Sequence, residues 1–600
     1  MFLCAYRVNG GPVDRAELWW PRGGAVEVQR AIVVDGSFAA AVRQGPRLLR
    51  PLLARYRHLL GVGDVRLDDR GAAARLAGLD GPGDRSDLEL ALAAIDARGE
   101  RAIGELIGDF GFVVWDPRAH KVIASRDAFG VRTLYHRTVG DVLYFADRIE
   151  TLRPAGDWDS EYFADYLMGM VAPGQRTPWR DVQGVSPGGF LLTRGSVRSE
   201  RRYWSADAFE PVERDAEAVD RFRGLLDEAV TTRMGAPGQT WAQLSGGLDS
   251  SSIVAIGYGT GEGLAGTITS VDTLGRGDER RFSDAVLKRY KVRNEQVVDQ
   301  WAWQDDGCPP PVTDGPGVLY PFFARERRMH EVLRLSGARV LLSGMGSDHY
   351  LSGSLDYLAD RAVAGDWRGT LSDLALWSVE RRRSFWGLAR AHLLAPLLPG
   401  FGRRAEHVPA WITSGFARDH ALDALLPHRR LAASPPGRKF AAPIAAGLRA
   451  IEAGLHRWPY GEEIEVRYPF LHRPLVEASL RLAPDLRIRP GGGTKFVLRE
   501  AMRGRLPEEV RTRTGKGTID DRIMWSFGRE RDRIDGLLGN SIMAQLGWID
   551  PRTLRDELHR ARCGVRTHMV HLMSALSLET WLAVRDGRWV QERHAAASAA

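Results

Sequence analysis

The stretch that most constrains the fold is LSGGLDSS at residues 244–251, between an apolar run and a helix-like segment. TWAQL (240–244) before it has the length and composition of a short buried strand, and SSIVAIGY after its first residues has those of a helix. The alternation continues with strand-like TITSVD (267–272), helix-like ERRFSDAVLKRY (279–290) and strand-like ARVLLSG (338–344). Strands that alternate with helices predict a doubly wound parallel sheet.

The octet has the composition of a phosphate-binding loop. Gly246 and Gly247 let the backbone turn tightly and bring its N–H groups close to an anion, beside the N-terminus of the next helix. The hydroxyls of Ser245 and Ser250 add possible donors. Asp249 would repel a bare phosphate, so we expect Mg²⁺ between this carboxylate and the phosphates. No GxxxxGK[ST] pattern occurs in the chain, which argues against γ-phosphoryl transfer.

Length and composition predict two domains in a reduced compartment. A chain of 600 residues is too long for one ordinary core. Residues 1–205 are β-rich with Gly and Asp turns, whereas the strand–helix alternation begins later, so we predict domains over 1–205 and 206–600. Three cysteines make no disulfide framework. The sequence has no bilayer-length apolar run, signal peptide or basic aromatic stripe, so we expect a cytoplasmic protein that binds neither membrane nor nucleic acid.

Later segments give the octet a family context. They are LLSGMGSDHYLSG (341–353), EVRYPFLHRPLVEASL (465–480), TKFVLREAM (494–502) and RTGKGT (513–518). The octet resembles the pyrophosphate loop of ATP pyrophosphatases, and the later segments resemble those of asparagine synthetases. The resemblance implies a doubly wound α/β ATP pyrophosphatase domain with helical additions, which cleaves ATP between its α and β phosphates.

The resemblance also assigns residues to ATP and Mg²⁺. Asp249 and Asp348 would hold Mg²⁺ on the pyrophosphate. The nucleotide contacts that it implies are Leu244, Ser245, Gly246, Gly247, Asp249, Ser250, Val271, Ser343 and Gly344.

Three further residues are catalytic candidates. Lys516 matches a lysine that reaches the ATP phosphates in the family. Lys495 is a second candidate, with a solvated helix lysine as the alternative. Glu465 would either orient an amine or form a structural pair with Arg467, and we favour the pair.

The front of the chain resembles the glutaminase-type domain of the same enzymes, which implies an Ntn-hydrolase-like αββα sandwich. GDFGFVVWDPRAHKVIASRDAFGVRTLYHR (108–137) and GVSPGGFLL (184–192) carry this resemblance. Such a domain uses a cysteine directly after the initiator Met, but here Phe2 and Leu3 precede Cys4. The Asn-Gly-Glu stretch of the family is replaced by VDGS. We therefore expect a degenerate domain that releases no ammonia, with Cys4 as a buried small hydrophobe.

If no ammonia is made, the amine must come from the substrate. The chain resembles two groups with that property, the β-lactam synthetases and the lasso peptide cyclases. The β-lactam group places a Tyr at the position of Met345, which cannot accept a proton. His349 and His472 replace the acidic residues of two family segments and put amino-acid-type recognition in doubt. We favour a lasso peptide cyclase, a macrolactam synthetase that uses ATP and Mg²⁺.

That resemblance implies a precursor core peptide as substrate, with a leader peptidase and a leader-binding protein as partners. The alternatives are an amide ligase acting on a small amino acid, as in β-lactam or asparagine synthetases, and a non-catalytic peptide-binding scaffold. Residues 395–440 are Pro- and Arg-rich and would be either a cover over the site or a surface insertion. His568 and His571 have metal-ligand spacing, but no third ligand is evident nearby.

Overall fold

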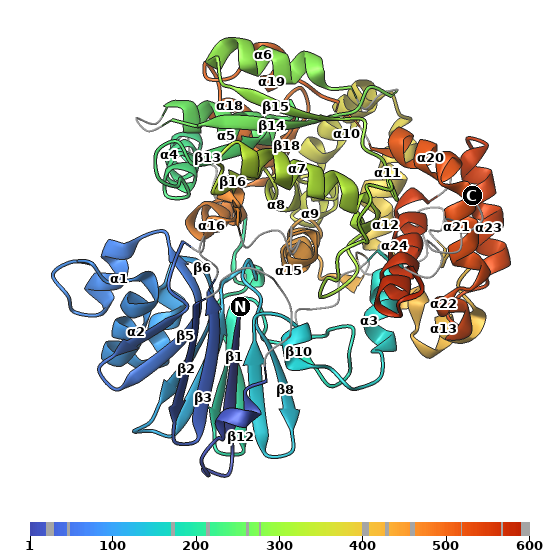
Figure 1. Ribbon diagram of the computed structural model, residues 1–600. Helices are drawn as coiled ribbons and strands as arrows, with labels where there is room; N and C mark the ends of the chain where they lie inside the picture. Colours follow the sequence, from blue (N-terminus) through green and yellow to red (C-terminus); the bar gives the residue numbers. More distant parts are fainter. Residues whose placement is uncertain are drawn as a thin grey trace. The chain divides into compact units, whose positions relative to one another are not determined.

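The chain forms two compact units, which are described separately (Figure 1). Unit 1 comprises Met1–Tyr162, Ala172–Ala208 and Leu448–Leu455, and unit 2 comprises Phe163–Val171, Phe209–Gly447 and His456–Ala600. The main change of unit lies at Ala208/Phe209, close to the predicted boundary, but the sequence did not predict the two short excursions. The computed structural model describes residues 1–19, 29–44, 49–169, 175–211, 217–259, 263–274, 278–398, 407–426, 431, 433–455, 463–515, 517, 519–565 and 568–589.

Unit 1 contains two six-stranded antiparallel sheets. The first has the order β10 (Gln183–Gly184), β8 (Tyr135–Val139), β9 (Val142–Ala146), β1 (Phe2–Arg7), β3 (Phe38–Gln44), β2 (Gln29–Asp35). The second has the order β12 (Val197–Arg202), β11 (Gly189–Arg194), β7 (Lys121–Arg126), β6 (Gly108–Asp116), β5 (Leu59–Leu67), β4 (Leu53–Tyr56). A shared apolar core that includes Phe38, Val62, Trp115 and Phe145 joins alternate residues of both sheets.

Helical cover in unit 1 differs from the predicted αββα sandwich. Helices α1 (Arg70–Leu76) and α2 (Asp87–Arg98) pack on the second sheet through a separate apolar cluster. On the first sheet, Trp19 packs on Tyr144 and a short 3-10 helix follows β9. The next helix, α3 (Ser160–Leu167), falls largely in unit 2, where Phe163 packs against Trp548 and Trp581. The described residues of unit 1 therefore form three main layers, because the helix that follows the first sheet has its apolar partners in unit 2.

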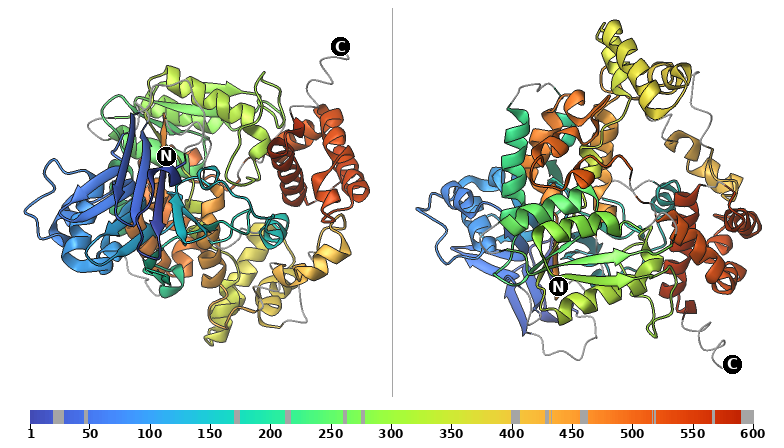
Figure 2. Two further views of the ribbon diagram at one scale, coloured as in Figure 1. Left: turned by 60° about the horizontal axis from the view of Figure 1, so that its bottom comes forward. Right: turned by 90° about the horizontal axis from the view of Figure 1, so that it is seen from above.

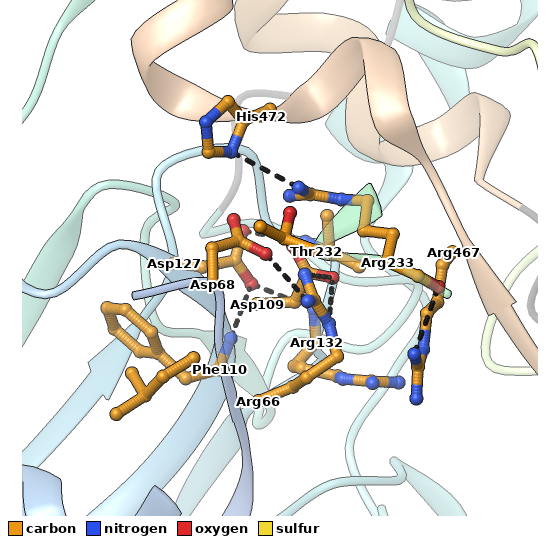
Figure 3. Close-up of polar contacts among 12 residues, drawn as sticks. Arg66, Asp68, Asp109, Phe110, Asp127, Arg132, Thr232, Arg233, Arg467 and His472 are labelled. Carbon is orange, nitrogen blue, oxygen red and sulfur yellow. Dashed lines mark hydrogen bonds and ion pairs between the residues drawn. The ribbon is translucent and has the colours of Figure 1, made fainter. Parts of the chain in front are cut away.

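A buried turn follows β7 in unit 1. Both oxygens of Asp127 accept backbone N–H groups, from Phe129 and Val131 at 3.0 Å and from Arg132 at 2.9 Å. Phe110 donates a fourth such bond (Figure 3). Burial, followed by the nearby charge of Asp109, raises the pKa of Asp127 to about 6. Asp127 thus holds this turn by accepting four backbone N–H groups.

Unit 2 is built on a five-stranded sheet in which every neighbouring pair is parallel. Its order is β15 (Asn294–Val298), β14 (Gly266–Val271), β13 (Thr240–Gln243), β16 (Val340–Leu342), β17 (Glu465–Arg467). Helices α5 (Leu248–Gly259) and α6 (Arg280–Tyr290) connect the first three strands, and α7 (Phe323–Leu335) leads to β16. Figure 1 shows α6 and α7 on opposite sides of the sheet. The sequence predicts β13, β14 and β16 at these places, but it did not predict β15 and β17.

Helical additions make up much of the rest of unit 2. Before the sheet lies α4 (Ala218–Thr231), and a yellow group that includes α9 (Tyr357–Val363) and α10 (Trp367–Arg381) extends away from the sheet (Figure 2). The last described helix is α24 (Met569–Arg585). The 395–440 stretch forms short helices where it is described, and 399–406, 427–430 and 432 lie outside the described residues. Among the described helices, none is long and apolar enough to cross a bilayer.

Candidate active site

The candidate site lies where the winding of the sheet reverses. Strands β13 and β16 are adjacent, and the chain continues from β13 to β14 on one side of this pair and from β16 to β17 on the other. Ligands of such sheets bind at this switch point, beyond the carboxyl ends of the strands. The loop 244–247 follows β13, and the loop 343–346 follows β16, so the topology brings the two predicted segments together.

The octet forms a loop that is closed by its own hydroxyls. Ser245 donates its backbone N–H to the hydroxyl of Ser250 at 3.1 Å, and the two hydroxyls are also 3.1 Å apart. The backbone N–H of Gly247 donates to the Ser245 hydroxyl at 3.3 Å. Gly246 has a φ of +75°, and a Cβ there would lie 2.8 Å from the backbone nitrogen of Ser283. Only glycine fits at that position without displacement of the loop.

Lys495 joins the two predicted Mg²⁺ ligands. Its ammonium lies 2.6 Å from Asp249 Oδ2 and 2.5 Å from Asp348 Oδ1, and it donates to the Ser347 hydroxyl at 2.9 Å. The Lys495 side chain is buried, and its φ of +56° is uncommon for a residue other than glycine. The alternative of a solvated helix lysine is therefore wrong, because two carboxylates compensate the buried charge.

The two carboxylates suit Mg²⁺ bound together with phosphates. Asp249 Oδ1 is buried and has no hydrogen-bond partner within the described part of the chain, while Oδ2 faces Lys495. No group of three or more His, Cys, Asp or Glu ligands occurs among the described residues. Mg²⁺ commonly takes one or two carboxylates, substrate phosphates and water, so Asp249 and Asp348 fit that role. When bound, the ion would neutralise charge on the phosphates.

The remaining predicted nucleotide contacts lie at the ends of neighbouring strands. Ser343 is buried and donates its N–H to Arg467 O at 2.9 Å, and a Cβ on Gly344 would lie 3.0 Å from the Ser250 nitrogen. Leu244 donates its N–H to Ile268 O on the neighbouring strand. Val271 ends β14 beside β13. These residues surround the mouth of the octet loop.

Lys516 lies outside the described residues, but its neighbours reach the octet loop. Arg513 pairs with Glu279, and one of its guanidinium nitrogens lies 3.5 Å from Gly246 O. Gly517 donates its N–H to the same Glu279 carboxylate at 2.6 Å. Arg513 was detectable from its place in the RTGKGT segment, whereas no sequence pattern singles out Glu279. Glu279 thereby holds Arg513 and Gly517 next to the loop.

Arg499 is a third residue that the sequence analysis did not single out. Its guanidinium donates to the Thr494 and Arg511 carbonyls at 2.8 and 2.5 Å. Burial lowers the pKa of Arg499, and the carboxylate of Asp249 opposes that shift. Arg499 therefore adds positive charge near the site.

Glu465 forms the structural pair that we favoured. Arg467 donates from two guanidinium nitrogens to Glu465 Oε2 at 3.0 and 2.7 Å. Arg467 also donates to the carbonyls of Arg233 and Met234. This pair fixes the end of β17, and the geometry gives no support to a role for Glu465 in orienting an amine.

The two histidines that replace acidic family residues are both held by other groups. His349 Nδ1 lies 3.3 Å from Gly346 O, and burial lowers the pKa of its imidazole. His472 is fully buried, with Nδ1 3.2 Å from an Arg233 guanidinium nitrogen (Figure 3) and Nε2 3.4 Å from Glu228. A structural role accounts for these contacts of His472. His568 and His571 contact each other through their rings, and no third ligand joins them within the described ranges.

Cys4 lies in the core of unit 1. It is fully buried on β1, opposite Ala40 on β3 and Phe145 on β9. Burial, reinforced by the charge of Asp147, raises the pKa of the thiol well above its ordinary value. A protonated, enclosed thiol is a poor nucleophile, which agrees with the expected role as a small hydrophobe.

Comparisons with known proteins agree with this geometry. Residues 221–583 match the family described as asparagine synthase, and residues 83–204 match the glutamine amidotransferase domain. Amidase chyE of Penicillium rubens is 25% identical, with 79% of each chain covered. Asparagine synthetase [glutamine-hydrolyzing] 1 of Bacillus subtilis is 23% identical over 72% of this chain and 71% of the relative. A putative asparagine synthetase of Mycobacterium tuberculosis is 24% identical, with 83% and 80% covered.

The amidotransferase match begins at residue 83 and so leaves out β1 with Cys4. The asparagine synthase match covers more than half of the chain and includes the octet loop, both carboxylates and Lys495. The chain belongs to the asparagine synthase family, whose members are ATP-dependent amide ligases.

Proposed function

We propose that the chain is an ATP-dependent macrolactam synthetase of the lasso peptide cyclase kind. It adenylates an Asp or Glu side-chain carboxylate of a precursor core peptide and joins it to the N-terminal amine of the same peptide. The products are an isopeptide-closed ring, AMP and pyrophosphate. Membership of the family supports an ATP-dependent amide ligase. Ring closure on a peptide is the further step that we propose.

The observation that carries the proposal is the contrast between Cys4 and Lys495. Lys495 links Asp249 and Asp348 beside the octet loop, so the residues for ATP activation are assembled. Cys4 is buried with a raised pKa, so unit 1 lacks the thiolate that releases ammonia from glutamine. A ligase that activates a carboxylate but makes no ammonia needs an amine that the substrate carries.

The reaction balances in two steps. A carboxylate oxygen of the peptide attacks the α-phosphorus of ATP, the bond to the β-phosphate breaks, and pyrophosphate leaves. The peptide amine then attacks the acyl carbon, loses a proton, and displaces AMP. The chain holds the phosphates on residues 245–250, supplies positive charge from Lys495 and from Lys516, and orients the amine against the acyl group.

A second candidate is an amide ligase that acts on a small amino acid. The relatives named asparagine synthetases favour it. Met345 at the position of a proton-accepting Tyr disfavours the β-lactam variant, because a thioether accepts no proton. Under the macrolactam proposal, the partners are the precursor peptide, a leader peptidase and a leader-binding protein.

The test incubates the purified protein with Mg-ATP and a leader-free core peptide, and measures the peptide mass and the nucleotide product. Loss of one water with formation of AMP supports the proposal. We expect Lys495→Ala and Lys516→Ala to abolish both signals, whereas Lys288→Ala, an exposed lysine on α6, retains them. AMP formed only with a small amino acid, or ADP in place of AMP, would overturn it.

A further inference from the structure

A polar cavity of about 650 Å³ in unit 2 lies behind the segments that reach the octet loop. Its lining comes from the end of α10, from the hairpin of β18 (Ile488–Arg489) and β19 (Gly493–Thr494), from α18 (Phe496–Ala501), and from the end of α19 (Glu508–Arg511) with the residues after it. Arg499, which adds positive charge near the active site, lines this cavity, but none of the residues assigned to ATP, Mg²⁺ or catalysis does.

Arginines dominate the charge of this cavity. Five arginines line it, against two glutamates; they are Arg381, Arg489, Arg499, Arg503 and Arg511. Both glutamates are already engaged, since Glu380 accepts the Gly491 N–H and Glu500 accepts from Arg503 and Arg511. The cavity therefore has a surplus of positive charge, which favours an anionic ligand.

Three of these arginines have no carboxylate partner among the described residues. Arg499 donates only to backbone carbonyls. Arg381 lies over the Trp377 ring at 4.8 Å, and Arg489 lies over the Phe496 ring at 3.5 Å. Stacking restricts a guanidinium while leaving its N–H groups available, which prepares it to bind a carboxylate in a bidentate manner.

The placement of Arg489 depends on a glycine. A Cβ on Gly492 would lie 2.8 Å from a Phe496 ring carbon and 2.9 Å from Arg489 Cγ. Any other residue at 492 would therefore push the Arg489 side chain or the Phe496 ring out of place. The hairpin is shaped to hold this arginine, which is more than an exposed basic surface requires.

Two segments of the chain contribute both to the cavity and to the surroundings of the octet loop. Along each segment, successive side chains alternate between the cavity and the loop. Thr494 and Phe496 line the cavity, while Lys495 between them contacts Asp249 and Asp348. Thr512 and Thr514 line it as well, while Arg513 pairs with Glu279 beside the loop. A ligand in the cavity thus contacts the backs of the segments that carry the catalytic-site cations.

We propose that this cavity binds a carboxylate-bearing part of the peptide substrate, held by Arg381, Arg489 and Arg499, away from the carboxylate that is activated. The proposal rests on the proposed function for the identity of the substrate. The cavity is a binding site for an acidic peptide, and it positions the substrate through the segments around Lys495 and Arg513.

A binding assay without ATP tests the site. The probe is a fluorescein-labelled peptide with two glutamates and an amidated end, measured by fluorescence anisotropy. We expect the Arg381→Gln/Arg489→Gln protein to bind it at least about tenfold more weakly than the unmodified protein, since charged hydrogen bonds are lost. Arg368→Gln, on the same helix α10 but outside the cavity lining, should bind as the unmodified protein does.

Gly492→Ala provides a second variant that retains every charge. We expect it to weaken binding of the glutamate peptide, because Arg489 is displaced. Equal affinity of the unmodified, double-variant and Gly492→Ala proteins would overturn the proposal. So would arginine-dependent binding of inorganic pyrophosphate without binding of the glutamate peptide, which would make the ligand a phosphate. A peptide with glutamines in place of the glutamates should not compete.

Turnover separates this proposal from the proposed function. If the chain makes AMP and dehydrated peptide but the double variant keeps the same KM for peptide, the cavity assignment fails and the function stands. If the glutamate peptide binds through Arg381 and Arg489 but no peptide yields AMP, the site stands and the function fails. With both correct, the KM for peptide rises in the double variant more than the KM for ATP does.

Discussion

Cys4 in unit 1 and Lys495 in unit 2 are both buried ionisable groups, but their surroundings differ. Cys4 is enclosed by apolar side chains between two sheets, and burial keeps its thiol protonated. Lys495 is buried between two carboxylates that compensate its charge. A charge is retained in a protein interior only where partners offset the loss of water. The contrast indicates that unit 2 keeps a site with buried charges, whereas Cys4 in unit 1 is a packed side chain.

The largest expected effect comes from the removal of the Lys495 charge. Lys495→Ala leaves Asp249 and Asp348 without their common partner and takes a cation from the phosphates. We expect AMP formation to fall at least about 100- to 1000-fold, as for the loss of a preorganised electrostatic contact. Lys288→Ala is the control on α6. Near-normal turnover of Lys495→Ala would place the catalytic charge elsewhere.

Gly246→Ala tests whether the shape of the octet loop matters as much as its charges. The new methyl group would collide with the Ser283 nitrogen at 2.8 Å and add strain at a φ of +75°. We expect the KM for ATP to rise about tenfold or more, because the loop N–H groups shift. Gly238→Ala is a matched control with the same φ of +75° and nothing within 4 Å. Equal KM values for the two variants would contradict this account, because the collision with Ser283 at Gly246 would then have no effect on ATP binding.

The buried carboxyl of Asp127 in unit 1 gives a second comparison with the buried charges of unit 2, through the pH dependence of stability. The pKa of Asp127 is raised to about 6, above the value of about 3.9 in an unfolded chain. The folded state therefore binds the Asp127 proton more tightly than the unfolded state does. Protonated Asp127 stabilises the fold at low pH, and this stabilisation is lost as the pH rises from about 4 through about 6. The loss amounts to about 3 kcal/mol over that window.

Urea unfolding of the wild-type and Asp127→Asn proteins across this window measures the effect. Asparagine does not titrate, so we expect the variant to lose this part of the slope of unfolding free energy against pH, even if it is less stable throughout. Identical slopes in both proteins would show that Asp127 is ionised in the fold.

The smallest effect on catalysis is expected at Cys4. We expect Cys4→Ala to leave AMP formation unchanged and to cost about 1 kcal/mol of stability from the lost packing. Iodoacetamide should label the exposed Cys308 and Cys563 in the native protein but spare Cys4. Rapid labelling of Cys4, or a loss of turnover in Cys4→Ala, would contradict its role as a packed residue.

The sequence predicted the parallel sheet and the octet loop well, because both depend on local patterns. TWAQL, TITSVD and ARVLLSG are strands at the expected places, and the motifs at 244–251 and 341–353 meet at adjacent strand ends. Side-chain pairing was harder to predict. For Lys495 the sequence left both a catalytic role and a solvated helix lysine open, because nothing local shows that Asp249 and Asp348 converge on it from positions far away in the chain.

The layer count of unit 1 and the role of Glu279 were missed for the same physical reason. The packing of α3 is decided by contacts of Phe163 with Trp548 and Trp581, which are distant in sequence. Glu279 precedes α6 without any motif and acts through Arg513 and Gly517. Such long-range partners become visible only when the chain is folded.

The most direct test measures AMP, glutamate and peptide mass together, with Mg-ATP and core peptide, in the presence and absence of glutamine. If unit 2 is the active ligase and Cys4 is only packed, AMP and dehydrated peptide form equally in both cases and no glutamate is released. Glutamate released in proportion to AMP, with no change in peptide mass, would contradict this. That result would make unit 1 a working glutaminase and the protein a ligase that uses ammonia.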